Sequence, residues 1–381
     1  MTHRTRRITR LLGAIAAGTL LFAGCSANSA SSGSASPEPA SAEESAEGTS
    51  GDDTSAADSS AGSAGDVMPL SEIKVALVNG GPHPYYASWP DAAAQAKKDF
   101  GLADVTFDDT SEWDQTKQNA LLDSLAARGY NAFAVFGVSP ADINSTFEHL
   151  RDEGFAVGSV TSCPAGDKDS AYFCLSTDVE QAAYEATKAL IDTLGGEGSI
   201  VHVTGLLVDS NTQRRIEGVE KAVAESNGKI KLVQHISDID NDLQTAEKAV
   251  TDLLVSRGSE VDGIVGTSTV SAEGAIAAVK KANLPIKIMA IDDTEPILDG
   301  IRDGSVAGTM VQNPWGQAYV GAYVVAKLQS GQCTINEDGI YVDSGSFLVG
   351  KDNVDTFDAK RIEKSKSLID DFNNKYLTCK G

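Results

Sequence analysis

Positive charge is scarce in this chain. Its 381 residues include 31 lysines and arginines against 54 aspartates and glutamates, which gives a formal net charge of −23 at pH 7. A nucleic acid binds through lysine and arginine contacts to its phosphates, and an anionic membrane surface repels a protein of this charge. We therefore expect no nucleic-acid partner and no binding to anionic lipid headgroups.

Long apolar runs are also scarce. The longest, residues 11–23, is too short to span a bilayer as a stable helix, and no other segment approaches the required length. A basic segment with four arginines precedes it, and small residues precede Cys25. This arrangement resembles a bacterial lipoprotein signal, which implies a signal peptide over residues 1–24 and lipid on Cys25. Phe22 departs from the usual leucine, and an ordinary secretory signal cleaved elsewhere is the alternative.

Lysine and arginine are absent from residues 26–67, which consist almost entirely of Ser, Ala, Gly, Glu, Asp, Thr and Pro. Such a segment cannot bury enough apolar surface to fold. We expect residues 25–67 to form a disordered tether. More than one acyl chain on Cys25 would anchor it stably to the extracytoplasmic face of the cell membrane.

Cysteine is rare, with five in the whole chain. With Cys25 assigned to lipid, an even number remains outside the cell, which suggests two disulfides and allows three connectivities. We favour Cys163–Cys174, which closes one loop, and Cys333–Cys379, which holds the C-terminal tail to the body. The spacings contain no close Cys or His pair, so we expect no metal site.

Catalytic motifs are missing as well. The chain has no His-Glu-x-x-His, no Gly-x-Ser-x-Gly and no P-loop, and its histidines lie in unrelated predicted elements. We expect neither an enzyme nor a cofactor. An anchored glycoside hydrolase is a remote alternative, because it needs two carboxylates at a defined separation, which a sequence does not reveal.

From about residue 73 onward, apolar runs of strand length alternate with helical patterns. About 310 residues suit two lobes better than one core. The predicted strands are Ile73–Val78, Val105–Phe107, Ala132–Gly137, Ala156–Val160, Ser199–Thr204, Ile230–His235, Gly263–Gly266, Ile286–Ile291 and Val306–Val311. The predicted helices lie near residues 88–100, 114–128, 140–153, 178–194, 212–226, 241–257, 270–282, 294–302 and 314–330. This alternation predicts an α/β protein with two parallel sheets of five or six strands.

The loop after the first predicted strand carries unusual side chains. His83 and Pro84 precede the adjacent aromatic residues Tyr85 and Tyr86, and an alanine-rich helix follows. Ligands of open α/β sheets bind at the carboxyl ends of strands, so these rings are candidates for a binding surface. The alternatives are that the tyrosines pack beneath the loop and that His83 is a solvated loop histidine.

Five segments resemble, in order and spacing, the ribose-binding-protein type of periplasmic solute-binding protein. They are residues 78–101, 129–133, 215–219, 291–293 and 308–314, and the resemblance covers essentially residues 73–345. It implies a type I fold of two Rossmann-like lobes joined by a three-segment hinge. The N-terminal lobe would contain residues 73–176 plus 313–341, and the C-terminal lobe residues 177–312 plus 342–381.

The resemblance also implies the function. Such proteins close their lobes around one small ligand, which is most often a sugar or polyol, and present the closed form to the membrane permease of an ABC importer. We expect a monomer of this kind. A ligand sensor that presents its closed form to a signalling receptor is the alternative from another class.

Carrying ligand positions over from the family gives a mixed picture. His83 falls on a polar ligand position, and Tyr85 and Tyr86 fall on paired aromatic positions. Thr161 and Ser162 stand where many sugar binders have an Asp-Arg pair, so a fork-shaped contact is missing. The remaining candidates for ligand contacts are Asp178, Gln213, Arg214, Ser268, Asp292 and Gln312.

Two of these positions have competing interpretations. Asp178 matches a ligand position, but an acid before a helix is also an ordinary cap. Gln213 replaces a common arginine, and Arg214 beside it could reach the ligand instead. We expect Arg215 to form salt bridges at the start of its helix. The presence of acids and the absence of the two expected arginines favour a neutral or cationic ligand over an acid sugar.

Overall fold

The computed structural model describes residues 67–166 and 169–380. The predicted signal peptide, Cys25 and the tether lie outside these residues, apart from Val67 at the end of the tether. Within the described part of the chain, no helix combines the length and the apolar character needed to cross a membrane.

The first sheet has six strands in the order β12-β5-β4-β3-β1-β2, and every neighbouring pair is parallel. Its strands are β1 (Lys74–Val78), β2 (Asp104–Asp108), β3 (Ala132–Val135), β4 (Ala156–Val160), β5 (Phe173–Ser176) and β12 (Ile340–Asp343). The strands β1, β3, β4 and β5 are almost wholly buried, as expected for a parallel sheet covered on both faces.

The second sheet also has six strands, in the order β13-β10-β9-β8-β6-β7. They are β6 (Gly198–Val203), β7 (Ile230–Ile236), β8 (Gly263–Gly266), β9 (Lys287–Ile291), β10 (Gly308–Val311) and β13 (Phe347–Val349). All pairs are parallel except β10 with β13, which is antiparallel. The prediction of two parallel sheets of five or six strands is confirmed, and the second sheet adds one antiparallel edge strand, β13.

A small antiparallel sheet joins β11 (Cys333–Ile335) to β14 (Leu377–Cys379). The helices follow in chain order. They are α1 (Trp89–Phe100), α2 (Gln115–Ala127), α3 (Ile143–Asp152), α4 (Val179–Thr193), α5 (Ser210–Ala224), α6 (Leu243–Arg257), α7 (Thr269–Ala282), α8 (Glu295–Asp303), α9 (Pro314–Gln329) and α10 (Phe357–Asp371). Short helical turns are η1 (Leu70–Glu72), η2 (Pro84–Ser88), η3 (Gly258–Glu260) and η4 (Phe372–Tyr376).

Helix boundaries follow local chemistry. The side chain of Asp114 accepts a hydrogen bond from the Lys117 amide at the start of α2, and Asp242 accepts one from the Thr245 amide at the start of α6. Helix α1 stops at Gly101, whose φ of 65° lies in the left-handed region that glycine adopts without penalty. These caps explain why the predicted helix ends lie within a few residues of the observed ones.

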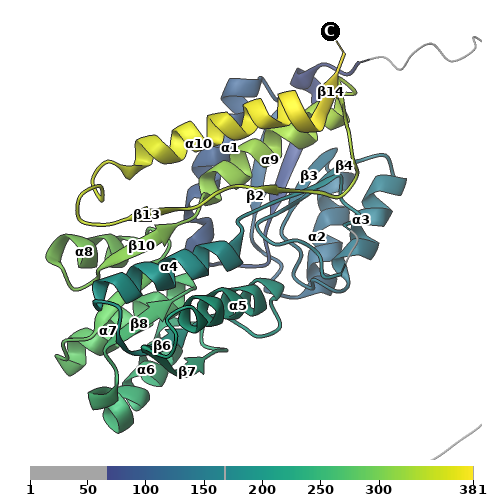
Figure 1. Cartoon of the computed structure of the whole chain (residues 1–381). Coiled ribbons are helices and arrows are strands. Elements are labelled where there is room, and N and C mark those ends of the chain that lie inside the picture. Colours follow the sequence, from purple (N-terminus) through teal and green to yellow (C-terminus); the bar gives the residue numbers. More distant parts are fainter. Residues whose placement is uncertain (1–66, 167–168, 381) are drawn as a thin grey trace, which may run out of the picture. The chain divides into compact units, whose positions relative to one another are not determined.

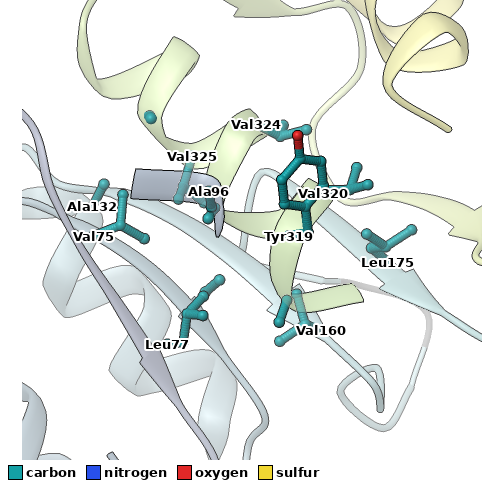
Figure 2. Close-up of a cluster of buried hydrophobic side chains, with 14 of the residues drawn as sticks. Val75, Leu77, Ala96, Ala132, Val160, Leu175, Tyr319, Val320, Val324 and Val325 are labelled. Carbon is teal, nitrogen blue, oxygen red and sulfur yellow. The ribbon is translucent and has the colours of Figure 1, made fainter. Parts of the chain in front are cut away.

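Helix α9 lies against the first sheet and carries much of its core. Figure 2 shows Val320, Val324 and Val325 of this helix among Val75 of β1 and other side chains from the sheet and from α1. These side chains are fully buried. Each buried aliphatic side chain of this size contributes about 1.5–3 kcal/mol. This packing fixes the position of the start of α9, where Gln317 lies.

Both favoured disulfides are present. Cys163 pairs with Cys174 across a Cα–Cα distance of 5.7 Å, and Cys333 pairs with Cys379 across 4.0 Å. The first bond ties the loop after β4 to β5, and the second joins β11 to β14.

The sequence patterns missed several elements. These are the strands β5, β11, β12, β13 and β14 and the helix α10. The five strands have only three or four residues each, too short for a periodic signal. Helix α10 lies alongside α9 in Figure 1, and it has few buried positions.

The chain after residue 342 contributes to both large cores. Val349 and Phe357 pack in the core of the second sheet, whereas Leu368 and Phe372 pack in that of the first. We expected this whole segment in the C-terminal lobe, and the lobe boundaries remain a prediction.

Candidate functional site

Polar and aromatic side chains collect in the loops that follow the parallel strands. Such loops share one edge of each sheet, which is the usual place for ligands. We use the name strand-end cluster for the residues that interact there: His83, Tyr85, Thr161, Arg215, Asp240, Ser268, Asp292, Gln312 and Gln317.

His83 precedes η2 and stabilises its first turn. Its Nδ1 accepts a hydrogen bond from the Tyr85 amide at 3.2 Å. Its Nε2 lies 3.5 Å from Oδ2 of Asp240, which follows β7. The two atoms are close enough to attract but not aligned as a hydrogen bond, since Nε2 is buried without such a partner. This contact connects the strand ends of the two sheets.

Tyr85 is held by a hydrogen bond and not only by packing. Its hydroxyl donates to Oε1 of Gln317 at 2.8 Å, and Thr161 Oγ1 donates to the same oxygen at 3.0 Å. Burial raises the pKa of the Tyr85 hydroxyl, and the nearby Asp292 carboxylate raises it further. Tyr85 therefore stays neutral, in electrostatic contact with an acid of the second sheet.

Tyr86 lies deeper than Tyr85 and is 5% exposed. Its ring meets Trp89 edge-on at 4.9 Å between centroids and Tyr85 at 5.2 Å. Trp89 is fully buried and belongs to the core. The packing interpretation thus describes Tyr86 well, because this ring supports Tyr85 from below.

Trp113, in the loop after β2, lies over the loop after β1 and is 44% exposed. A Cβ on Gly80 or Gly81 would come within 2.7 Å of its indole ring, so both positions require glycine. The ring also meets His83 edge-on at 6.2 Å. Trp113 therefore offers an exposed aromatic surface beside His83.

Asp292 follows β9 and is 4% exposed, with a φ of 73°. Its Oδ1 accepts a hydrogen bond from Gln312 Nε2 at 2.7 Å, and its Oδ2 accepts one from Thr269 Oγ1 at 2.5 Å. Burial raises the pKa of Asp292 to about 6, although these two hydrogen bonds and Arg215 act to lower it. Above that pH the site contains a buried carboxylate with remaining lone pairs for a donor.

Ser268 follows β8 and contacts a second acid. Its hydroxyl donates to Oδ1 of Asp240 at 2.9 Å. Asp240 is 18% exposed at the side chain. The carboxylate of Asp240 thus lies between Ser268 of its own sheet and His83 of the other.

Arg215 corrects the expectation of helix-start salt bridges. Among the described residues it makes no ion pair and no hydrogen bond, and its Nε is buried. The guanidinium nevertheless lies close enough to lower the pKa values of Tyr85, Asp209 and Asp292. A cation with unused donors therefore lies within electrostatic reach of Tyr85 and Asp292.

Three predicted ligand residues lie elsewhere. Asp178 caps α4 by accepting from the Gln181 amide at 3.2 Å, and it also accepts a 2.8 Å hydrogen bond from Arg214. Arg214 lines a cavity of about 330 Å³ together with Tyr341 and the Cys163–Cys174 disulfide. Gln213 is exposed and donates to the carbonyl of Leu207 at 3.0 Å. These contacts do not bring Asp178, Gln213 or Arg214 into the strand-end cluster.

Ser162 is buried beside the cluster, and its hydroxyl has no hydrogen-bond partner among the described residues. Its neighbour Thr161 has a φ of 71°, and the Thr161 carbonyl accepts from Asn211 at 3.4 Å. Ser162 was predicted as a ligand residue, and its hydroxyl has no hydrogen-bond partner among the described residues that would compete with a ligand.

Sequence reasoning missed Asp240, Gln317 and the position of Arg215. Asp240 could have been found, because it follows the predicted strand 230–235 within a few residues. Gln317 could not be found by its distance from a strand end, because it lies in the first turn of α9.

Two sheets with ligand-type side chains at their strand ends define a solute-binding protein of the type I periplasmic class. The model of the periplasmic binding protein domain family matches residues 75–333, and the chain belongs to this family. Its members are solute-binding proteins and not enzymes.

The individual relatives share about a quarter of their residues with this chain. The chain is 26% identical over 261 residues to the xylitol-binding protein of Mycolicibacterium smegmatis, covering 68% of this chain and 72% of the relative. It is 25% identical over 259 residues to the ribose import binding protein RbsB of Haemophilus influenzae, covering 66% and 83%.

Solved structures share the fold. An ABC transporter solute-binding protein of Burkholderia graminis, in complex with D-arabinose, has a TM-score of 0.67 at 22% identity and covers 77% of this chain and 99% of its own. The Caulobacter myo-inositol-binding protein has a TM-score of 0.66 at 21% identity, with coverages of 76% and 97%.

Proposed function

We propose that this protein captures a sugar or polyol at the strand-end cluster and delivers it to an ABC importer in the membrane. The observation that supports the proposal most directly is the contact between His83 and Asp240. It places the strand ends of both sheets around one set of polar groups. The relatives named for xylitol and ribose support the same class of ligand.

The chemistry of the cluster suits such a ligand. Tyr85 and Trp113 offer aromatic faces to the apolar C–H side of a sugar ring. Asp240, Asp292 and Arg215 offer charge-assisted hydrogen bonds to hydroxyl groups, which are about twice as strong as neutral ones. Closure of the two lobes would exclude water and strengthen each of these bonds.

Ligand binding is tested by thermal unfolding against a panel of pentoses, hexoses, polyols, amino acids and nucleosides. A ligand at about a hundred times its dissociation constant stabilises a protein by about 2.7 kcal/mol. We expect a rise in melting temperature with at least one sugar or polyol. No shift with any of them, for protein shown by mass spectrometry to be ligand-free, would exclude the sugar proposal.

Closure and delivery require separate measurements. Small-angle X-ray scattering should show a smaller radius of gyration with the ligand bound, because closed lobes are more compact. Uptake of the radiolabelled ligand by cells should depend on this protein. Normal uptake in cells that lack it would contradict the importer role and favour a sensor.

We further propose that the protein is monomeric and is attached by lipid on Cys25. Cells fed an alkyne-labelled fatty acid should label the natural protein but not a Cys25→Ser variant. Light scattering of the soluble part should give the mass of one chain. An unlabelled natural protein would mean that the signal is cleaved as an ordinary secretory signal.

A further inference from the structure

The chain passes between the two sheets three times. The connections from β5 to α4, from β10 to α9 and from β12 to β13 each join one sheet to an element of the other. Helix α4 packs in the core of the second sheet, and α9 packs in that of the first. We call residues 177–178, 312–313 and 344–346 the crossing segments. Rotation of one sheet against the other must turn the backbone in these segments.

Gln317 lies where two crossing segments meet, and it is fully buried. Its Nε2 donates to Ser344 Oγ at 3.0 Å and to Thr177 Oγ1 at 3.3 Å, and these two hydroxyl oxygens lie 3.1 Å apart. Its Oε1 accepts from Tyr85 and Thr161. A glutamine amide donates two hydrogen bonds and accepts two. The protein fills all four positions, so Gln317 holds other side chains and has no group left for a ligand.

Thr161 has a backbone conformation that needs such support. Its φ of 71° lies in a region that β-branched residues rarely adopt, and such a conformation persists only where neighbours hold it. Its carbonyl accepts a hydrogen bond from Ser176 Oγ at 2.5 Å and one from Asn211 Nδ2 at 3.4 Å. Asn211 belongs to α5, which packs with the second sheet. Thr161 therefore connects Gln317 to both sheets.

The strand ends of the two sheets touch in this structure. His83 Nε2 lies 3.5 Å from Asp240 Oδ2, and the hydrogen bond from Asn211 to the Thr161 carbonyl is a second contact of this kind. The structure therefore shows the closed arrangement of the two sheets. The four hydrogen bonds of Gln317 belong to this arrangement.

We propose that Gln317 couples ligand binding to the closure of the two sheets. Opening turns the crossing segments, moves Thr177 and Ser344 relative to α9, and so loosens the hold of Gln317 on Tyr85 and Thr161. A ligand that fixes Tyr85 and Thr161 favours the closed arrangement by the same free energy, because coupling between two sites is reciprocal. This inference rests on the proposed sugar or polyol function and makes Gln317 a positioning residue of that site.

The main test is Gln317→Met, which removes all four hydrogen bonds at a similar side-chain volume. The probe is the sugar or polyol of the thermal panel that raises the melting temperature most, starting with D-ribose and xylitol. Stopped-flow fluorescence measures its association and dissociation rates. One hydrogen bond lost from the closed form alone shifts the equilibrium by about 2- to 12-fold. We expect dissociation to be at least about tenfold faster and association to change by less than about threefold.

Gln118→Met is the matched control for lost stability. Gln118 is also fully buried, and it makes three hydrogen bonds, to the carbonyls of Asn79 and Phe136 and from the amide of Val138. These partners lie in loops of the first sheet, outside the crossing segments. We expect this variant to melt at a lower temperature but to release the probe at the natural rate. Equally fast release from both variants would mean that Gln317 has only a structural role, and would overturn the inference.

Ser344→Ala tests the connection to the crossing segments. The Ser344 hydroxyl bonds to Gln317 and Thr177, and its removal should speed dissociation by about 2- to 12-fold. Ser330→Ala is the control, because it removes a buried hydroxyl at the other end of α9. If Gln317→Met releases the probe faster but Ser344→Ala does not, Gln317 supports Tyr85 and Thr161 without any coupling to closure. The inference is then wrong, while the sugar-binding function stands.

A ligand-free measurement separates the inference from the proposed function. Spin labels on Thr116→Cys and Val208→Cys lie at exposed positions in α2 and in the loop after β6, one beside each sheet. Pulsed electron paramagnetic resonance should show longer distances between the labels in Gln317→Met than in the natural sequence. If no sugar or polyol binds to the natural protein, the proposed function fails. The label distances then decide the inference, and equal distances overturn it.

Discussion

The strand ends of the two sheets carry different chemistry. Loops after β1 and β2 supply His83, Tyr85 and Trp113, which are aromatic. Segments after β6, β7 and β9 supply charge, in Arg215, Asp240 and Asp292. One sheet thus offers a stacking surface and the other offers strong hydrogen bonds. A ligand with an apolar face and a polar edge needs both.

The two regions also differ in how they are stabilised. Both disulfides lie in the part of the chain that packs with the first sheet. One joins the loop after β4 to β5, and the other joins β11 to β14. Among the described residues the second sheet has no disulfide. It contains a buried polar chain instead, in which His202 Nδ1 lies 2.7 Å from His235 Nδ1 and His202 Nε2 lies 2.6 Å from Thr267 Oγ1.

The largest effect is expected from removing the tail disulfide. The pair Cys333→Ser and Cys379→Ser opens a loop with a sequence separation of 46 residues. The free energy of unfolding should fall by about 4 kcal/mol from the lost restriction of the unfolded chain. Urea unfolding of the variant and the natural protein measures this difference. An unchanged midpoint would show that buried side chains such as Phe372 hold the tail without the bond.

The second effect separates the charged side from the aromatic side. Asp292→Ala removes a buried acceptor and leaves Gln312 and Thr269 without their partner. Hydrogen bonds to charged groups contribute about 1.5–3 kcal/mol, so ligand affinity should fall by about 10- to 150-fold. Calorimetry with the bound sugar measures the loss. Full affinity in this variant would place the ligand away from the strand-end cluster.

The third effect is a pH dependence of the second sheet. Burial and the neighbouring His235 lower the pKa of His202 well below its ordinary value. The unfolded chain, with a histidine pKa of about 6.5, then binds more protons than the folded protein at mildly acidic pH. Stability from this residue is fully present above pH 6.5 and is lost as the pH falls, by at most about 1.4 kcal/mol per pH unit.

His202→Gln removes this titration while keeping a polar side chain. Asp292 acts in the opposite direction, because its raised pKa of about 6 makes the folded state bind more protons between about pH 4 and 6. The measurement is therefore the difference in the free energy of unfolding between the natural protein and the variant. Urea unfolding at several pH values from 4.5 to 8 gives this difference. A difference that does not vary with pH would mean that the pKa of His202 is the same in the folded and the unfolded protein.

The smallest effect distinguishes the two tyrosines. Tyr85→Phe breaks the 2.8 Å hydrogen bond to Gln317 and should lower the free energy of unfolding by about 1 kcal/mol. Tyr86→Phe is the matched control, because the described structure shows no hydrogen bond for its hydroxyl and its ring packs as an aromatic. If both changes lower the free energy of unfolding equally, the hydrogen bond of Tyr85 does not distinguish it from the core residue Tyr86.

Most of the fold could be predicted because its strands are buried on both faces. A run such as Ala156–Val160 is apolar or small at every position, and each run is followed by a helix with its own cap. Short edge strands such as β13 have no such pattern, because they form only where a neighbouring strand offers backbone groups. Their pairing depends on residues far away in the sequence.

Members of the strand-end cluster, the candidate site, could be predicted where a residue directly follows a strand. Asp292, Gln312 and Ser268 lie at such ends, and the structure brings each into the strand-end cluster. Residues on helices were harder to place. Among the neighbours Gln213, Arg214 and Arg215, the prediction chose the first two, whereas it is the third whose charge acts on Tyr85 and Asp292.

The sequence by itself determined the alternation of strands and helices, the two sheets and the positions of the loops, because these depend on local periodicity and caps. The tertiary structure decided which side chains meet. Successive residues on a helix point about 100° apart, so the residue that faces the site depends on the rotation of the helix. Helix α5 packs closely on α4 at Gly218, where a Cβ would lie 2.2 Å from the Glu180 carbonyl oxygen of α4. Such a contact between two helices depends on residues far apart in the sequence, and no local pattern specifies it.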